Sequence, residues 1–227
     1  MRRILVVDDE PAIRTLLSSY LVHDGYAVDE AGDGEAALAA LRAHPFDLVL
    51  LDIMLPGMDG LEVLRQLRTF SDVYVILVTA RTEEVDKLVG LRVGADDYIT
   101  KPFSPREVLA RVQAVLRRER DRAGGENDRR LRFERVAIDL DERTVVVDGR
   151  EVALSALEFD LLAALAGSPR RVFSRTQLLE RVWGYDFYGD ERVVDVHIRN
   201  LRAKIGDDAR NPTVIATVRG VGYKFTG

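Results

Sequence analysis

Short apolar runs alternate with segments of helical periodicity through the first half of this 227-residue chain. The apolar runs predict strands at residues 4–7, 27–30, 48–51, 73–78 and 98–99. The helical periodicity predicts helices near residues 11–22, 34–43, 60–68, 83–92 and 105–118. Five strands that alternate with five helices favour a parallel sheet with helices on both faces. The first half is therefore predicted to be a doubly wound α/β domain.

The second half has a different pattern, in which short strands come before the helices. Strands are predicted at residues 131–133, 136–140, 144–147 and 151–154. Two capping boxes, Ser-x-x-Glu at Ser155 and Ser-x-x-Gln at Ser174, mark the starts of two helices. A third helix is predicted at about 191–205, and a glycine-turned hairpin at 214–225. This half is predicted to be an α+β domain with an antiparallel sheet.

A charged segment separates the two halves. Residues 117–130 are mostly charged, contain Gly124-Gly125 and include no large apolar residue. Such a segment cannot bury a core of its own. We therefore predict one domain at 1–118, a flexible linker at 119–130 and a second domain at 131–227.

Charge and composition restrict the classes of function. Residues 1–120 hold 15 basic and 20 acidic side chains, whereas residues 170–224 hold 11 basic and 7 acidic ones, which indicates a basic patch near the end. The chain has no cysteine, which excludes a disulfide scaffold and thiolate chemistry, and its three histidines are too scattered to favour a zinc centre. No apolar run approaches the roughly 20 residues of a membrane span, and the first residues do not form a secretory signal. We expect a cytoplasmic protein without a membrane partner.

Side chains suited to phosphate chemistry follow four of the five predicted strands. Asp8 and Asp9 follow the first strand, Asp52 the third, Thr79 the fourth and Lys101 the fifth. In open α/β sheets, ligands bind outside the carboxyl ends of the strands, at the point where the strand order reverses. If the order is 2-1-3-4-5, strands one and three flank that point. The three carboxylates would then converge.

Three neighbouring carboxylates repel one another unless a cation lies between them. Mg²⁺ is a hard cation that prefers oxygen ligands and keeps room for waters and an anionic oxygen. Lys101 adds a fixed positive charge and Thr79 a hydroxyl donor, a set that suits phosphoryl transfer. An aspartate can itself be the nucleophile and form an acyl phosphate.

Four motifs resemble the receiver domain of the two-component response regulators: Val7-Asp8-Asp9-Glu10, Asp52-Ile53-Met54-Leu55-Pro56-Gly57-Met58-Asp59-Gly60, Thr79-Ala80 and Lys101-Pro102-Phe103. The resemblance covers residues 2–118 and implies a flavodoxin-like fold. It implies that Asp52 accepts a phosphoryl group from a sensor histidine kinase and that Asp9 and Asp52 bind Mg²⁺ directly. Asp8 would act through water or as a supporting partner, and the Met54 backbone carbonyl would complete the protein ligands. Lys101 would pair with the phosphoryl group, and its bond to Pro102 would be cis.

The same resemblance implies a switch and a dimer surface. Thr79 and Tyr98 match the family's switch pair, in which the hydroxyl moves toward the phosphoryl group and the ring rotates into the space. One receiver subfamily dimerises on phosphorylation through a charged face, with the pairs Lys87–Glu107, Asp97–Arg111 and Asp96–Arg118 expected across a two-fold axis. The expected interface residues are Lys87, Leu91, Asp96, Asp97, Glu107, Ala110, Arg111 and Arg118.

The predicted helix at 191–205 has two contrasting faces. At 100° per residue, one narrow apolar stripe predicts the core side, and it consists of Val194, Ile198, Leu201 and Ile205. The opposite side and its flanks carry side chains suited to base edges and phosphates. These are Arg192, Val196, Arg199, Asn200 and Ala203, with His197, Arg202 and Lys204 on the flanks.

Helix, turn, helix and basic hairpin together resemble the winged-helix effector domain of the OmpR/PhoB subfamily, over about residues 131–226. The resemblance implies binding to double-stranded promoter DNA, with Arg219 at the hairpin tip in a minor groove. The aromatic loop at 182–190 can contact RNA polymerase in that family. The expected DNA-binding residues are Arg192, Val196, His197, Arg199, Asn200, Arg202, Lys204, Arg219 and Tyr223.

These expectations combine into one function, a transcriptional regulator that dimerises and binds tandem promoter sites once Asp52 is phosphorylated. Two alternatives stay open at this point. One is a constitutive DNA-binding dimer that is indifferent to phosphate. The other is a phosphatase with an aspartate nucleophile, but haloacid-dehalogenase-type enzymes place a second Asp two residues after the nucleophile, where this chain has Met54. We therefore expect no turnover enzyme, only self-catalysed phosphorylation of Asp52 and slow loss of the phosphoryl group.

Overall fold

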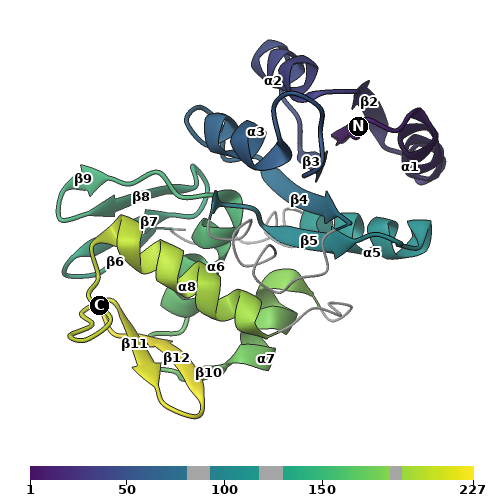
Figure 1. The fold of residues 1–227 in the computed structure, drawn as a ribbon. Helices are drawn as coiled ribbons and strands as arrows, with labels where there is room; N and C mark the ends of the chain where they lie inside the picture. The colour runs from purple at the N-terminus through teal and green to yellow at the C-terminus, as the bar shows by residue number, and fades with distance from the viewer. Residues whose placement is uncertain (81–92, 118–129, 185–190) are drawn as a thin grey trace. The chain divides into compact units, whose positions relative to one another are not determined.

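The structure is a computed structural model that describes residues 1–80, 93–117, 130–184 and 191–227 (Figure 1). The chain forms two compact units, residues 1–116 and 117–227, and each is described by itself. The predicted linker at 119–130 lies almost wholly outside the described residues, as does the helix predicted at 83–92. Among the helices that are described, none combines the length and the apolar character needed to cross a membrane.

The first unit is a five-stranded parallel sheet in the order β2-β1-β3-β4-β5, which confirms the predicted doubly wound architecture. Its strands are β1 (Arg3–Val7), β2 (Ala27–Ala31), β3 (Leu48–Asp52), β4 (Tyr74–Thr79) and β5 (Asp97–Thr100). Its described helices are α1 (Pro11–His23), α2 (Gly34–Ala43), α3 (Gly60–Leu67) and α5 (Pro105–Arg117). Helices α1 and α5 lie on one side of the sheet, and α2 and α3 on the other (Figure 1). The order places β1 beside β3, as the convergence of the carboxylates requires.

The central strands β3 and β4 are apolar up to their last residues, Asp52 and Thr79, because helices cover both faces of the sheet. Every residue of β3 and β4 is buried. The helices supply apolar faces to match, such as Leu17 and Leu21 of α1 and Val63, Leu64 and Leu67 of α3. The side chains at the strand ends are therefore held by a rigid, well-packed sheet.

The loop after β3 is held close to the strand that it leaves. The Gly60 N–H donates to the Ile53 carbonyl at 3.0 Å. A Cβ atom at Gly60 would lie 2.1 Å from the Asp52 carbonyl oxygen, so no other residue fits without moving the backbone. Asp59 then caps α3 by accepting a hydrogen bond from the Glu62 N–H at 2.8 Å. The course of residues 53–59 is thus fixed at both ends.

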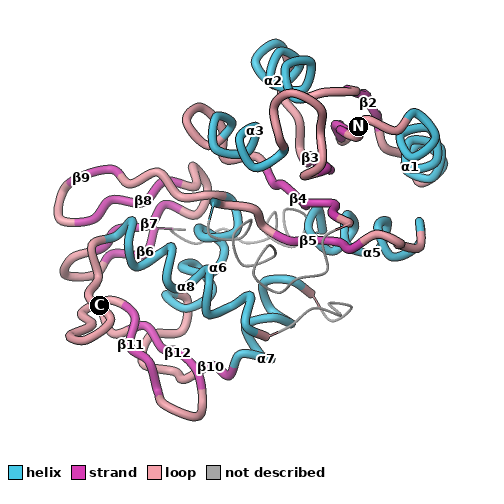
Figure 2. Tube along the Cα trace, in the orientation of Figure 1, coloured by secondary structure: helices cyan, strands magenta, loops and turns pink. Residues whose placement is uncertain are grey.

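The second unit opens with an antiparallel sheet in the order β6-β7-β8-β9 and ends with a three-stranded sheet in the order β10-β12-β11. Three helical segments follow the first sheet, and β10 lies between the first two of them: α6 (Ala156–Ala166), α7 (Arg175–Leu178) with the π-helical turn η1 (Leu179–Trp183), and α8 (Arg192–Ile205). Figure 2 shows the β11–β12 hairpin with its loop at the free end. The strands are β6 (Arg130–Arg132), β7 (Val136–Asp139), β8 (Thr144–Val147), β9 (Arg150–Glu151), β10 (Phe173–Ser174), β11 (Ile215–Val218) and β12 (Gly222–Phe225).

The predicted capping boxes at Ser155 and Ser174 are both confirmed, as are the helix at 191–205 and the terminal hairpin. Two details differ from the prediction. The fourth strand is shorter, Arg150–Glu151 in place of 151–154. The helix after Ser174 widens after one α-helical turn into η1, with Leu179, Val182 and Trp183 all buried.

The core of the second unit is built on α6 and α8. Ten of the eleven α6 residues are buried, so this helix is covered on nearly every side. The predicted apolar stripe of α8 is confirmed, since Val194, Ile198, Leu201 and Ile205 are all buried. Glu158 and Asp160 of α6 are buried as well and are neutralised by Lys204 and Arg143.

The close approach at Gly60 yields a test of the loop geometry. Gly60→Ala should lower the free energy of unfolding of the first unit by roughly 3 kcal/mol, because the new methyl group displaces packed backbone. Gly57→Ala is the matched control, since Gly57 has φ +76° but open space around its Cβ position. It should cost only about 1–2 kcal/mol from the left-handed backbone conformation. Urea unfolding followed by circular dichroism measures both; equal losses would contradict the inferred steric conflict.

Candidate functional site

An acidic cluster lies at the carboxyl ends of β1 and β3. Asp8, Asp9 and Asp52 each offer one carboxylate oxygen, and these oxygens lie within 4.8 Å of one another. Asp8 and Asp52 are buried, whereas Asp9 is exposed. The sheet order brings together the three residues that the sequence pattern predicted to converge.

The Lys101 ammonium group lies between the two buried carboxylates. Its Nζ atom is 2.6 Å from Asp52 Oδ2 and 2.8 Å from Asp8 Oδ2. The predicted cis bond between Lys101 and Pro102 is confirmed, and the Lys101 N–H donates to the Thr79 carbonyl at 2.7 Å. Burial opposes the charge on the ammonium group, but the two carboxylates outweigh it and raise the pKa of Lys101.

The second oxygen of each buried carboxylate is held by the backbone. Asp8 Oδ1 accepts a hydrogen bond from the Glu10 N–H at 3.0 Å, and Asp52 Oδ1 accepts one from the Met54 N–H at 2.9 Å. Burial raises the pKa of the Asp8 carboxyl, while the hydrogen bond from Lys101 works in the opposite direction. Both carboxylates are therefore fixed in orientation by one backbone and one ammonium donor.

The donor set at this cluster fits a divalent cation such as Mg²⁺. It consists of carboxylate oxygens, two of them on a rigid sheet and the third, from Asp9, exposed to solvent. Hard cations of this size prefer oxygen ligands and retain waters, which an exposed edge of the site permits. Met54, whose carbonyl was predicted to contribute, lies in the loop beside Asp52 with its side chain exposed.

Thr79 and Tyr98, the predicted switch pair, lie on neighbouring strands. Thr79 is buried at the end of β4, and Tyr98 of β5 is half-buried. In the parallel register Leu77 is opposite Tyr98 and Thr79 is opposite Thr100. Thr79 is two residues beyond Leu77, so Thr79 and Tyr98 are diagonal neighbours on one face of the sheet.

The predicted dimer surface is only partly described, because Lys87, Leu91 and Arg118 lie outside the described residues. Glu107 and Ala110 of α5 are partly exposed, as expected for an interface. The Arg111 guanidinium group contacts Asp97 at 2.9 Å and Glu107 at 3.1 Å within the same chain.

The expectation that Asp96 faces a partner is wrong. This side chain is fully buried and pairs with Arg68 of its own chain at 2.9 Å. It also accepts a hydrogen bond from the Val75 N–H at 2.7 Å. Asp97 is buried too, and it pairs with Arg111 within its own chain. The sequence analysis did not identify Arg68 as the partner of Asp96. Arg68 also donates to the carbonyls of Gly94 and Val73 and so anchors the turn before β5.

Four of the predicted DNA-binding cations are exposed in the second unit. Arg192, Arg199 and Lys204 lie on the exposed face of α8, and Arg219 lies at the tip of the β11–β12 hairpin. Asn200 is half-buried on the same helix. Lys204 also contacts the buried Glu158 of α6 at 2.6 Å. Arg192, Arg199 and Arg219 are thus exposed to solvent, whereas Lys204 is engaged with α6.

The expectation that Val196, His197, Arg202 and Tyr223 face outward is wrong, since all four are buried. The His197 ring packs against Trp183, with their centroids 5.5 Å apart. The other two polar side chains hold the terminal hairpin. Arg202 donates to the Ile215 carbonyl and the Thr217 hydroxyl, and the Tyr223 hydroxyl donates to an α8 carboxylate.

That carboxylate is Asp195, which the sequence analysis did not single out. It accepts hydrogen bonds from Tyr223 at 2.6 Å and from Arg175 of α7 at 2.8 Å. A buried tyrosine hydroxyl needs a partner, but the chain spacing gave no indication of which residue would supply it. Of the predicted polymerase-contacting loop, Val182 and Trp183 are buried, and residues 185–190 lie outside the described residues.

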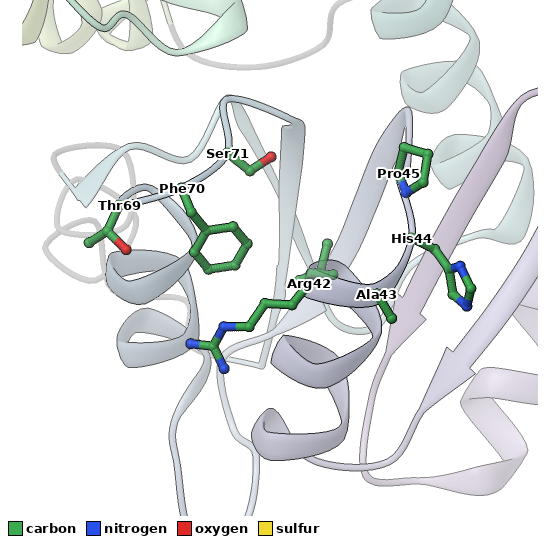
Figure 3. Close-up of a pocket in the computed structure, with 8 residues that line it drawn as sticks. Arg42, Ala43, His44, Pro45, Thr69, Phe70 and Ser71 are labelled. Atoms are coloured by element: carbon green, nitrogen blue, oxygen red, sulfur yellow. The ribbon is translucent and has the colours of Figure 1, made fainter.

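A shallow pocket lies away from the acidic cluster, at the opposite end of the sheet of the first unit (Figure 3). Residues 41–45, which span the end of α2 and the start of the following loop, and residues 69–71 after α3 line it. The Arg42 guanidinium group lies 5.3 Å from the centroid of the Phe70 ring. None of the predicted site residues belongs to this pocket.

Comparisons with known proteins cover both units of the chain. Residues 4–113 match the family of response regulator receiver domains, and residues 149–225 match the family described as transcriptional regulatory protein, C terminal. The DNA-binding response regulator MtrA of Mycolicibacterium smegmatis is 50% identical over 98% of this chain and 96% of its own length. The sensory transduction protein RegX3 of the same organism is 47% identical over 100% of both chains. The crystal structure of DrrB, an OmpR/PhoB homologue from Thermotoga maritima, is 37% identical with a TM-score of 0.54 over 100% of both chains.

The ammonium bridge at Lys101 yields a stability test. Lys101→Gln should lower the free energy of unfolding by about 3 kcal/mol in the presence of EDTA, because it leaves two buried carboxylates without their cation. Millimolar Mg²⁺ should restore more stability to this variant than to the parent chain, because the ion supplies the missing positive charge. Urea unfolding with EDTA and with Mg²⁺ measures both effects.

Arg65→Gln is the matched control, because it removes a cation that pairs with Glu62 at the exposed surface of α3. Little change in stability is expected for this variant. Equal losses for the two variants, or no response of Lys101→Gln to Mg²⁺, would contradict the role assigned to the ammonium group.

Proposed function

This chain belongs to the two-component response regulators of the OmpR/PhoB type, and from that membership we propose that phosphorylation of Asp52 controls its binding to promoter DNA. The observation that carries the proposal is the Lys101 ammonium group shared by the buried Asp8 and Asp52 carboxylates. It supplies, beside a nucleophilic carboxylate, the fixed positive charge that a phosphoryl group requires.

The proposed reaction is transfer of a phosphoryl group from the phosphohistidine of a sensor histidine kinase. An oxygen of the Asp52 carboxylate attacks the phosphorus, the O–P bond forms, and the P–N bond of the phosphohistidine breaks. The electron pair of that bond stays on the imidazole nitrogen. Lys101 moves its hydrogen bonds from the carboxylate to the phosphoryl oxygens. Asp8, Asp9, Asp52 and the Met54 carbonyl would hold Mg²⁺, which offsets negative charge on the phosphoryl oxygens when it is bound.

The proposed response to phosphorylation starts at Thr79, whose hydroxyl would turn toward the phosphoryl group. Tyr98 lies diagonally opposite on the next strand, so its ring would be the first large side chain to respond. We propose that the surface around β5 and α5 then pairs with a second copy. The proposed interface leaves out Asp96 and Asp97, whose side chains are buried in ion pairs within their own chain. It consists of Lys87, Leu91, Glu107, Ala110, Arg111 and Arg118.

The proposed DNA contacts come from the exposed side of α8 and from the hairpin tip. Arg199 and Arg192 are suited to guanine edges or phosphates in the major groove, and Arg219 to the minor groove. Asn200 and Lys204 would flank them. A dimer would place two such units on tandem half-sites about one helical turn apart, and linkage raises the effective concentration of the second unit. RNA polymerase is the further partner proposed for the loop at 182–190.

Two alternatives make different demands on the site. A constitutive DNA-binding dimer does not require a buried pair of carboxylates held by an ammonium group. Such a pair is costly to form, because all three charged groups lose contact with water. A phosphatase needs a general acid or base two residues after Asp52, and the side chain of Met54 cannot serve. We therefore propose no turnover activity beyond the phosphorylation of Asp52 and its slow reversal.

The central test replaces the phosphoacceptor. Asp52→Asn keeps the shape of the side chain but removes the nucleophile, so labelling from acetyl phosphate with Mg²⁺ should fall to background. The phosphodonor should then raise neither the dimer fraction nor the affinity for DNA. Asp72→Asn, at an exposed position of the same unit, should behave as the parent chain. Unchanged dimerisation and DNA affinity of Asp52→Asn with the phosphodonor present would favour the constitutive dimer.

A second test separates the two kinds of DNA contact. Arg199→Ala should weaken binding to a selected site by about 1–3 kcal/mol if Arg199 contacts a base, with a smaller loss on random DNA. Arg219→Ala should lower the slope of log affinity against log salt by about one phosphate contact. Titrations of labelled duplexes at several salt concentrations measure both. An equal loss of Arg199→Ala on random DNA would reassign this residue to the phosphate backbone.

A further inference from the structure

Tyr223 connects two elements that are far apart in the sequence. It lies on β12, and its hydroxyl donates to Asp195 Oδ1 in the first turns of α8 at 2.6 Å. The side chain is buried, so the hydroxyl is not available to a DNA groove. This hydrogen bond joins the DNA-reading helix to the hairpin that carries Arg219.

Arg175 at the start of α7 completes the junction. Its Nε atom donates to the same Asp195 oxygen at 2.8 Å, and its guanidinium carbon lies 5.4 Å from the centroid of the Tyr223 ring. The Arg202 guanidinium carbon lies 5.8 Å from that centroid and belongs to a side chain that donates to β11. Residues of α7, α8, β11 and β12 therefore meet at one tyrosine ring.

The chemistry of this junction suits a permanent connection. A carboxylate on the exposed side of a DNA-reading helix repels phosphates, and the Arg175 charge offsets that repulsion. Burial and the neighbouring carboxylate raise the pKa of Tyr223 to about 12. The hydroxyl therefore keeps its proton, and remains a donor, at neutral pH. A hydrogen bond to a charged acceptor is also stronger than a neutral one.

Strand pairing in the terminal sheet connects Tyr223 to the rest of the hairpin. Tyr223 is opposite Thr217 of β11 on one side and Phe173 of β10 on the other. Gly222 fits closely, since a Cβ atom there would lie 2.0 Å from the Phe173 carbonyl oxygen. A change in the position of Tyr223 relative to α8 would accordingly move β12 and the hairpin tip with it.

We propose that Tyr223 is a positioning residue for DNA recognition, which fixes the hairpin relative to α8 through its hydrogen bond to Asp195. The inference rests on the proposed function, because it requires α8 and Arg219 to contact DNA. Tyr223 then acts on DNA binding through the position of the hairpin, whereas the sequence analysis expected it to contact DNA directly. Helix and hairpin then bind neighbouring grooves as one rigid unit, without the loss of conformational entropy that ordering a free hairpin would cost.

The test is Tyr223→Phe in the full chain, on a duplex that the parent protein selects from a random pool. Hydroxyl-radical cleavage reports minor-groove protection, and methylation of guanine N7 reports major-groove protection. The variant should lose minor-groove protection at the hairpin and retain major-groove protection at α8. Its affinity for the selected duplex should fall roughly threefold to tenfold, the range for one lost hydrogen bond, and the hairpin variant Arg219→Ala should then add little further loss.

Thr176→Val is the matched control. It removes another hydroxyl–carboxylate hydrogen bond of 2.6 Å between α7 and the residue before α8, to Glu191, without touching the hairpin. Its footprint in both grooves should match that of the parent chain. Thermal unfolding of both variants measures any general loss of structure.

Three results would overturn the inference. Unchanged protection in both grooves for Tyr223→Phe would show that the hydroxyl does not position the hairpin. Loss of both protections together, with a lowered melting temperature, would show a purely structural role. A parent chain that selects no duplex would overturn the proposed function and this inference with it, so the two failures are distinguishable.

Discussion

Two carboxylates buried side by side can persist only with a cation between them, and this constraint governs the first unit. Asp8 and Asp52 lie on adjacent strands, and the Lys101 ammonium group bridges them at 2.8 and 2.6 Å. Removing two charges from water costs several kcal/mol each unless their partners are well placed. The fold provides that placement through the strand order 2-1-3-4-5, which sets Asp8 and Asp52 side by side. The same arrangement leaves an anionic edge, at Asp9, open to a divalent ion.

Buried carboxylates also anchor loops elsewhere in the molecule. Asp96 accepts the Val75 N–H and the Arg68 guanidinium group, which holds the turn before β5. Asp207 accepts the N–H groups of Thr213, Val214 and Ile215 and so fixes the entry to the terminal hairpin. A carboxylate satisfied by several backbone donors is well stabilised in a protein interior. Buried carboxylates with fixed donors thus organise both the acidic cluster of the first unit and the terminal hairpin of the second.

The sequence was sufficient to predict the α/β sheet and, on the condition of a 2-1-3-4-5 strand order, the convergence of Asp8, Asp9, Asp52 and Lys101, because strand ends in a parallel sheet meet at one edge. The core stripe of α8 was predictable for a similar reason, since helical periodicity identifies the side with the most apolar residues. Periodicity did not reveal that Trp183 and β11 cover further parts of that helix, which is why His197 and Arg202 are buried. The pairing of Asp96 with Arg68 spans 28 residues and joins the end of α3 to the turn before β5. Such contacts leave no periodic signal in a single sequence.

The burial of Trp183 against His197 has a practical consequence, because Trp183 is the single tryptophan of the chain. Its indole emission originates entirely in the second unit, next to α8, while the first unit contributes none. Chemistry at the acidic cluster changes the tryptophan emission only if it alters the surroundings of that one ring. The native chain therefore carries a built-in fluorophore for communication between its halves, and no label needs to be attached to detect it.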